Sequence, residues 1–187
     1  VIKKDNQKDN EKDNEEMSLT VDNTPPTPEA SEPFTPRAEY PRPILVRDQW
    51  QSLNGPWSFR VDPDNRGVTD AWFDGPWTDA QTLTVPFSMD SAASGIAEAE
   101  GAAVVWYQRE VIKSEAWHSR IVLRVGASDF LTRVFVNGEE VGQHRGGYAS
   151  FGLDIEHALM PGRNRITIRV EDSLSWTQPR GKQAGTT

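Results

Sequence analysis

Apolar and polar residues alternate with a period of two in several short runs of the chain. Trp57, Phe59 and Val61 are separated by Ser58 and Arg60 in the first of these runs. Such alternation is typical of a β-strand with one buried face. Similar short runs with strand character cover residues 82–85, 104–111, 121–125 and 166–170. No stretch has the sustained 3.6-residue period of a long helix.

The clearest local signal is the pair Asn137-Gly138, which lies between two short strand-like runs. A type I′ turn requires positive φ at both central residues, so Asn-Gly predicts a β-hairpin. Gly146-Gly147 is expected to break the outgoing strand as a bulge or bend. Further on, Asp154 is expected to cap a short helical turn that runs to Leu159.

About eight short strands with regularly spaced turn signals predict an all-β fold, either a β-sandwich or a jelly roll. The strand order does not follow from the pattern. Residues 44–183 hold this pattern and form the predicted domain, and residues 184–187 are interpreted as the truncated start of a linker to a next domain.

Residues 1–43 are expected to form a disordered tail. Residues 1–16 repeat Lys-Asp-Asn three times and lack the apolar area needed to offset the entropy of ordering. Residues 18–43 carry seven of the 13 prolines, which indicates an extended linker. Because the chain begins with Val1 and Met17 follows the repeat, either Met17 is the true start or the N-terminus is cut from something longer.

Charge and cysteine content limit the classes of partner that the chain is expected to bind. A net charge of −8 argues against nucleic acid or an anionic membrane surface as a partner. The sequence has no cysteine, no apolar run of the ~20 residues that span a bilayer and no signal peptide. These features do not determine the cellular compartment, and the cytoplasm is favoured.

Few residues in the sequence form a pattern that is typical of catalysis, metal binding or cofactor binding. The three histidines, His118, His144 and His157, show no ligand spacing, so no metal is expected. No P-loop, dinucleotide fingerprint or Gly-x-Ser-x-Gly elbow predicts a cofactor or a nucleophile. Glu139 and Glu140, beside the hairpin turn, are expected to be solvated charges.

The sequence has seven tryptophans, whose rings can stack on sugar rings, although packing in the core is the simpler role for any one of them. Trp176 differs from the others because it lies in a polar stretch with Asp172, Arg180 and Lys182.

Taken in order, several segments resemble the N-terminal sugar-binding domain of family 2 glycoside hydrolases, the group of β-galactosidases, β-glucuronidases and β-mannosidases. Each segment is common alone, and the order makes the resemblance specific. The segments are LNGPWSF (53–59), VP (85–86), VWYQR (105–109), VFVNGEEVGQHRGGYASF (134–151), DI (154–155), GRNRITIRV (162–170) and PRGKQ (179–183).

The resemblance implies a galactose-binding-like jelly-roll β-sandwich that precedes an immunoglobulin-like domain and a (β/α)₈ barrel. In that family two barrel glutamates hydrolyse O-glycosyl bonds with retention. About 140 residues remain after the linker, whereas a barrel takes about 250. The chain is therefore interpreted as a fragment of a retaining β-glycosidase that lacks the catalytic residues. Its expected partners are a β-glycoside and the missing domains, and the resemblance leaves a homo-oligomer open for the full-length enzyme.

By the resemblance, the loop after the last strand approaches the barrel mouth, where an aspartate contacts the sugar in some members. Asp172 is the matching residue, and Trp176, Arg180, Lys182 and Gln183 complete the predicted substrate-binding set. The alternative for this loop is simple packing on the next domain. The alternatives for the whole chain are a self-standing carbohydrate-binding module and a structural buttress domain.

Overall fold

The computed structural model describes residues 35–39, 47–96, 102–117 and 120–172. All of them lie in the unit Pro33–Thr187. Short strands dominate this part of the chain, and its two 3₁₀ turns are η2 (Ala92–Ser94) and η3 (Glu156–Ala158). The strands are β1 (Gly55–Val61), β2 (Gln81–Val85), β3 (Val104–Lys113), β4 (Val122–Val125), β5 (Leu131–Val136), β6 (Glu139–Arg145), β7 (Phe151–Asp154) and β8 (Gly162–Glu171). The predicted all-β class is confirmed.

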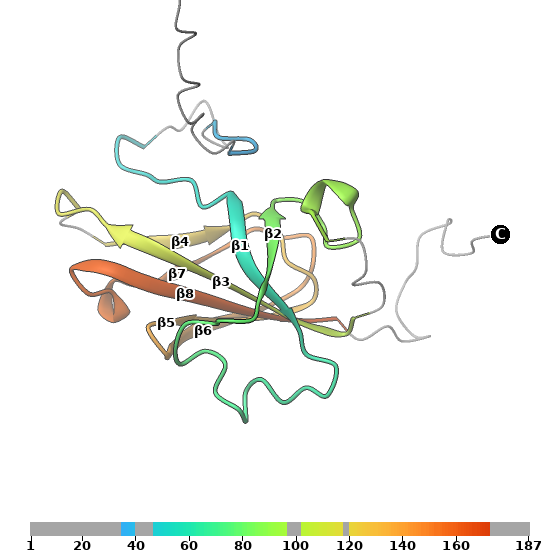
Figure 1. Cartoon of the computed structure of the whole chain (residues 1–187). Helices are drawn as coiled ribbons and strands as arrows, with labels where there is room; N and C mark the ends of the chain where they lie inside the picture. The colour runs from blue at the N-terminus through green and yellow to red at the C-terminus, as the bar shows by residue number, and fades with distance from the viewer. Residues whose placement is uncertain (1–34, 40–46, 97–101, 118–119, 173–187) are drawn as a thin grey trace, which may run out of the picture. The chain divides into compact units, whose positions relative to one another are not determined.

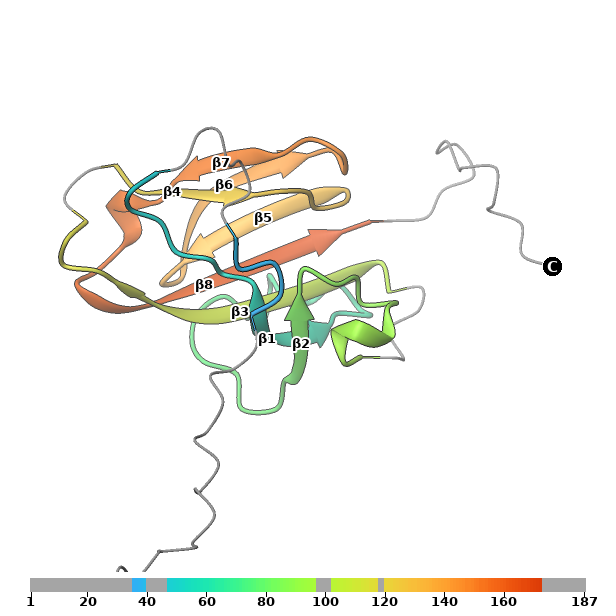
Figure 2. The same cartoon turned by 90° about the horizontal axis from the view of Figure 1, so that it is seen from above.

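The strands form two antiparallel sheets. The larger sheet has six strands in the order β2-β1-β3-β8-β5-β6, and the smaller sheet pairs β4 with β7. Figures 1 and 2 show β4 and β7 as a layer against the six-stranded sheet. This is the sandwich arrangement of a jelly roll, and its strand order is the feature that periodicity alone does not provide.

The main core lies between the two sheets. Its buried side chains come from alternate positions of the strands and from the turn around η3, as the period of two predicts. They are Trp57, Leu123, Val134, Val136, Ile155, Ala158 and Ile166. A second cluster, which includes Phe59, Leu83 and Val105, continues this core toward β2.

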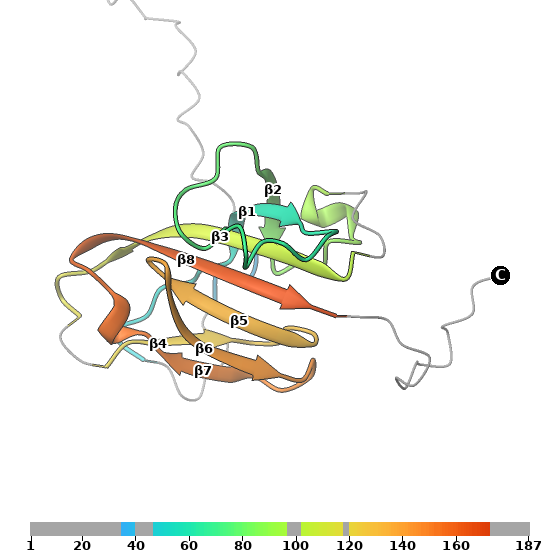
Figure 3. The same ribbon diagram turned by 90° about the horizontal axis from the view of Figure 1, so that it is seen from below.

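The opposite, outer face of the six-stranded sheet is also partly covered. Residues 62–80, which connect β1 to β2, cross this face, as Figure 3 shows. Phe73 stacks on Phe135 with ring centroids 4.6 Å apart, and Trp72 lies 5.9 Å from Trp106. Trp106 is consequently fully buried. Strand β3 is thus buried on both faces along its first half, whereas its sequence predicts one buried face.

The predicted hairpin is confirmed. Asn137 and Gly138 have φ values of 52° and 90°, and they connect β5 to β6. The Asn137 side chain also donates to the carbonyl of Ala158 at 2.8 Å and accepts from the backbone N–H of Arg165 at 2.9 Å. The turn therefore fixes the neighbouring η3 and β8 segments in addition to reversing the chain.

The predicted break after the hairpin is confirmed, because strand β6 ends at Arg145, directly before Gly146, which has φ of 125°. The predicted helical turn exists as η3, but its N-cap residue is Ile155 and not Asp154. The carboxylate of Asp154, one residue earlier, accepts from the N–H of Glu156 at 3.2 Å. None of the described helices is long and apolar enough to cross a membrane. The expected tail lies outside the described residues, except for 35–39.

Candidate functional site

The end of β8 is where the sequence places the substrate-binding residues. Three other segments meet it there through backbone hydrogen bonds. Asp172 donates to the carbonyl of Ala103 at 2.9 Å, Phe130 donates to Glu171 at 3.3 Å, and Gly146 donates to Phe130 at 2.8 Å. The start of β3 and the 126–130 and 146–150 loops therefore converge on the last described residues of the chain.

A buried arginine organises the strand just before this end. Arg169 is 3% exposed, and its Nη2 donates to Asn65 at 2.6 Å and to Glu171 at 2.7 Å. A buried guanidinium is tolerated when a carboxylate and further hydrogen bonds compensate its charge. The contact ties β8 to the 62–80 segment and fixes Glu171 next to Asp172.

Asp172 itself is half-buried, and its carboxylate has no hydrogen-bond or ion-pair partner among the described residues. Its backbone is held by the bond to Ala103, so the side chain starts from a defined position. A carboxylate of this kind can accept two hydrogen bonds from adjacent hydroxyls. Trp176, Arg180, Lys182 and Gln183 lie outside the described residues.

Exposed aromatic side chains occur at the same end of the sandwich. Tyr148 is 100% exposed and Phe130 is 38% exposed, and the guanidinium of Arg145 lies 5.7 Å from the Phe130 ring centroid. Neither aromatic residue belongs to the predicted set, because a loop position carries no periodic signal for exposure. The available polar and aromatic groups suit contact with a sugar or with a neighbouring domain.

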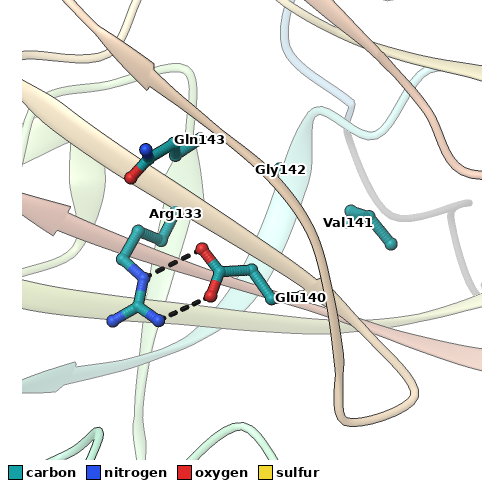
Figure 4. A pocket seen from close by; sticks show the side chains of 5 residues that line it. All are labelled: Arg133, Glu140, Val141, Gly142 and Gln143. Carbon is teal, nitrogen blue, oxygen red and sulfur yellow. Dashed lines mark hydrogen bonds and ion pairs between the residues drawn. The ribbon is translucent and has the colours of Figure 1, made fainter.

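A second candidate is an open hollow beside the β5–β6 hairpin. Arg133 and Glu140 form a bidentate ion pair with N–O distances of 3.0 and 2.6 Å, as Figure 4 shows. This hydrogen bonding lowers the pKa of Glu140 and raises the pKa of Arg133. Glu140 is therefore not the purely solvated charge expected from the sequence. Because the two charges satisfy each other, the hollow offers little unpaired polarity to a ligand. Its lining residues are Arg133, Glu140, Val141, Gly142 and Gln143.

Histidines contribute no metal site in the described part of the chain, where no group of three or more His, Cys, Asp or Glu side chains is placed to hold an ion. His144 stacks on Phe151 with ring centroids 4.2 Å apart. This contact supports a structural role for His144.

Comparison with known proteins gives the family. The sequence model described as "Glycosyl hydrolases family 2, sugar binding domain" matches residues 50–183. The chain therefore belongs to glycosyl hydrolase family 2, and the matched part is the family's sugar-binding domain. The matched residues include every segment on which the sequence resemblance rests, from LNGPWSF (53–59) to PRGKQ (179–183).

Three similar proteins are β-glucuronidases. A β-glucuronidase from Paenibacillus borealis is 36% identical over 146 residues, which is 76% of this chain and 24% of that protein. The Homo sapiens β-glucuronidase is 36% identical over 152 residues, which is 74% of this chain and 23% of the relative. A solved β-glucuronidase from an uncultured Clostridium sp. superposes with a TM-score of 0.63 at 29% identity, covering 71% of this chain and 24% of that one. The chain thus spans about a quarter of the length of these relatives.

Proposed function

We propose that this chain is the N-terminal sugar-binding domain of a retaining β-glycosidase that hydrolyses β-glucuronides. The observation that carries the proposal is the 36% identity to two β-glucuronidases from distant organisms, which extends over about three quarters of the chain. The resemblance to the family implies that the two catalytic glutamates lie on a barrel, which this chain does not contain. This chain then supplies binding and support rather than bond cleavage.

Within that role, Asp172 is the residue proposed to orient the substrate. Its unpartnered carboxylate and its fixed backbone at the end of β8 support this assignment. Trp176, Arg180, Lys182 and Gln183 follow it closely in sequence and complete the proposed set. A cationic pair such as Arg180 and Lys182 suits a sugar with an acidic group, as in a glucuronide.

The test is the substrate profile of the longer protein encoded by the same gene. We expect its kcat/KM for p-nitrophenyl β-glucuronide to exceed that for the matching β-galactoside and β-mannoside. The 187-residue chain assayed alone is expected to hydrolyse none of them. A preference for another glycoside overturns the glucuronide assignment, and a stop codon after Thr187 overturns the enzyme-fragment proposal.

A further inference from the structure

A short piece of the proline-rich segment that precedes the domain is held against the domain itself. Residues 35–39 lie before the stretch 50–183 that the family model matches. Within this piece, Pro36 is buried and Thr35 is half-buried. Figure 2 shows the piece, in blue, beside the start of β1. A free polyproline segment keeps its backbone in water, so this burial indicates a specific contact.

The side chain of Asn54 makes this contact. Its Nδ2 donates to the carbonyl of Pro36 at 3.1 Å and, over a longer distance, to the carbonyl of Arg37 at 3.4 Å. An asparagine amide carries two N–H donors, so one side chain can hold two consecutive carbonyls. Because both acceptors are main-chain oxygens, Asn54 recognises the path of the backbone through residues 36 and 37.

The held piece forms a turn. Arg37 has φ of 49°, in the left-handed region that residues other than glycine rarely adopt. A residue keeps this conformation only where the surrounding structure holds it, and the bonds from Asn54 do so here. The side chain of Arg37 is 78% exposed, and its ion pair with Glu39 at 3.7 Å contributes little. The main chain therefore carries the contact, and the arginine side chain stays accessible.

The domain fixes Asn54 independently of residues 35–39. The carbonyl of Leu53 accepts from the indole N–H of Trp57 and from Nη1 of Arg109, each at 2.7 Å. Nη1 of Arg109 also donates to the carbonyl of Asn54 at 3.0 Å, and the N–H of Asn54 donates to Oγ of Ser52 at 3.3 Å. Trp57 belongs to the main core. The Asn54 amide therefore extends from a backbone that β1 and β3 hold in place.

We propose that residues 35–39 are a clasp, a segment of this chain that docks on Asn54 in cis and protects the peptide bond after Arg37 from proteolysis. Only 17 positions separate Arg37 from Asn54, so the loop between them closes at small entropic cost. A protease that cleaves after arginine acts on the open state, in which the segment is extended. Water then adds across the Arg37–Ala38 bond, and the residues before Ala38 leave the domain.

The test is limited digestion of the 187-residue chain with trypsin, followed by mass spectrometry. The reference is a synthetic peptide of residues 33–43, which contains the same bond after Arg37 without the domain. We expect cleavage there to be at least about tenfold slower in the chain than in the peptide. Asn54→Asp keeps the shape of the side chain but replaces its donors with acceptors, so it should raise the rate about tenfold. Gln51→Glu is the matched control, because Gln51 is exposed in the same segment, and it should leave the rate unchanged.

Cleavage after the buried Arg169 reports unfolding of the whole domain, and Asn54→Asp should leave it unchanged. If it rises as well, Pro36→Ser decides, since this change leaves Asn54 intact; measured against a peptide with the same substitution, it should lower the protection.

Equal cleavage of the unmodified chain and its peptide overturns the proposal, as does unchanged protection in Pro36→Ser. A contact in cis has an effective concentration of about millimolar, so protection should be the same at roughly 1 and 100 µM chain. Protection that grows with concentration would assign the docked segment to a second copy of the chain and overturn docking in cis.

Discussion

The indole N–H of Trp106 donates to Oδ2 of Asp62 across 2.9 Å, and both side chains are buried. The same carboxylate accepts from the backbone N–H groups of Arg66 and Gly67, each at 2.8 Å. Asp62 thus holds the start of the 62–80 segment in its folded path and anchors it to β3. A buried carboxylate is stable here because three N–H donors surround it.

Asp62→Ala is expected to lower the free energy of unfolding by roughly 3 kcal/mol. The substitution leaves the Trp106 indole and two backbone N–H groups without an acceptor, and each unsatisfied buried donor costs about 1–3 kcal/mol. Urea denaturation followed by tryptophan fluorescence measures the change. Asp64→Ala is the control, because Asp64 is exposed in the same loop and should change stability little. Equal stability of the two variants would show that the Trp106 contact contributes nothing.

Gly67→Ala tests how closely the 62–80 segment approaches the sheet. A Cβ at this position would lie 2.6 Å from Nε1 of Trp106 and 2.8 Å from Oδ2 of Asp62. Overpacking of this kind typically costs about 1–3 kcal/mol. We expect thermal unfolding to show a lower Tm for this variant. Gly126→Ala is the matched control, since nothing lies within 4 Å of a Cβ there; a similar Tm change in both would contradict the predicted clash.

Local signals in the sequence predict the strands and the hairpin but miss this anchoring. Asn137-Gly138 identifies its turn because the required φ values depend on those two residues alone. By contrast, the Asp62–Trp106 bond joins residues 44 positions apart. The sequence around Asp62 is typical of any polar loop. Coverage of the outer face, and hence burial of both faces of β3, depends on such long-range contacts and cannot be seen in periodicity.

The same limit applies to the candidate sites. Asp172 is proposed from the resemblance to the family, because its position after the last strand is a local feature. The cleft on the outer face of the six-stranded sheet, lined by Ser58, Trp77 and Arg165 among others, is not predicted, because it combines four strands that are distant in sequence. Ser58 and Arg165 have the pattern of ordinary polar positions in alternating strands. Their shared surface appears only once the strand order is known.

Tyr107 gives the domain a predicted sensitivity to alkali. Burial raises its pKa to about 12, with a smaller contribution from the charge of Asp90. An unfolded tyrosine ionises near pH 10. The unfolded state therefore loses its proton first, so stability is full below about pH 10 and falls as the pH rises from there toward 12.

Tyr107→Phe should remove this part of the alkaline destabilisation. Urea midpoints measured from pH 8 to 12 are expected to fall less steeply for the variant than for the unmodified chain. Tyr148→Phe serves as the control, since Tyr148 is fully exposed and its ring contributes nothing to the core. Identical pH profiles for the unmodified chain and Tyr107→Phe would contradict the prediction.

Asp172 is the residue through which this domain is proposed to act on the substrate. Asp172→Asn in the longer protein keeps the size of the side chain but removes the charge that strengthens its hydrogen bonds to sugar hydroxyls. Such bonds contribute about 1.5–3 kcal/mol, so kcat/KM for the β-glucuronide should fall by roughly tenfold to a hundredfold. Steady-state kinetics with p-nitrophenyl β-glucuronide provide the measurement.

A purely structural role for Asp172 predicts a different result. In that case the Asp172→Asn enzyme would show the same kcat and KM per folded molecule and an altered Tm instead. Asp64→Asn, at an exposed position of another loop, controls for the loss of a surface carboxylate. A fall in kcat/KM with unchanged Tm, confined to Asp172→Asn, identifies direct contact with the sugar, since only a group that binds the substrate separates the kinetic effect from the stability effect.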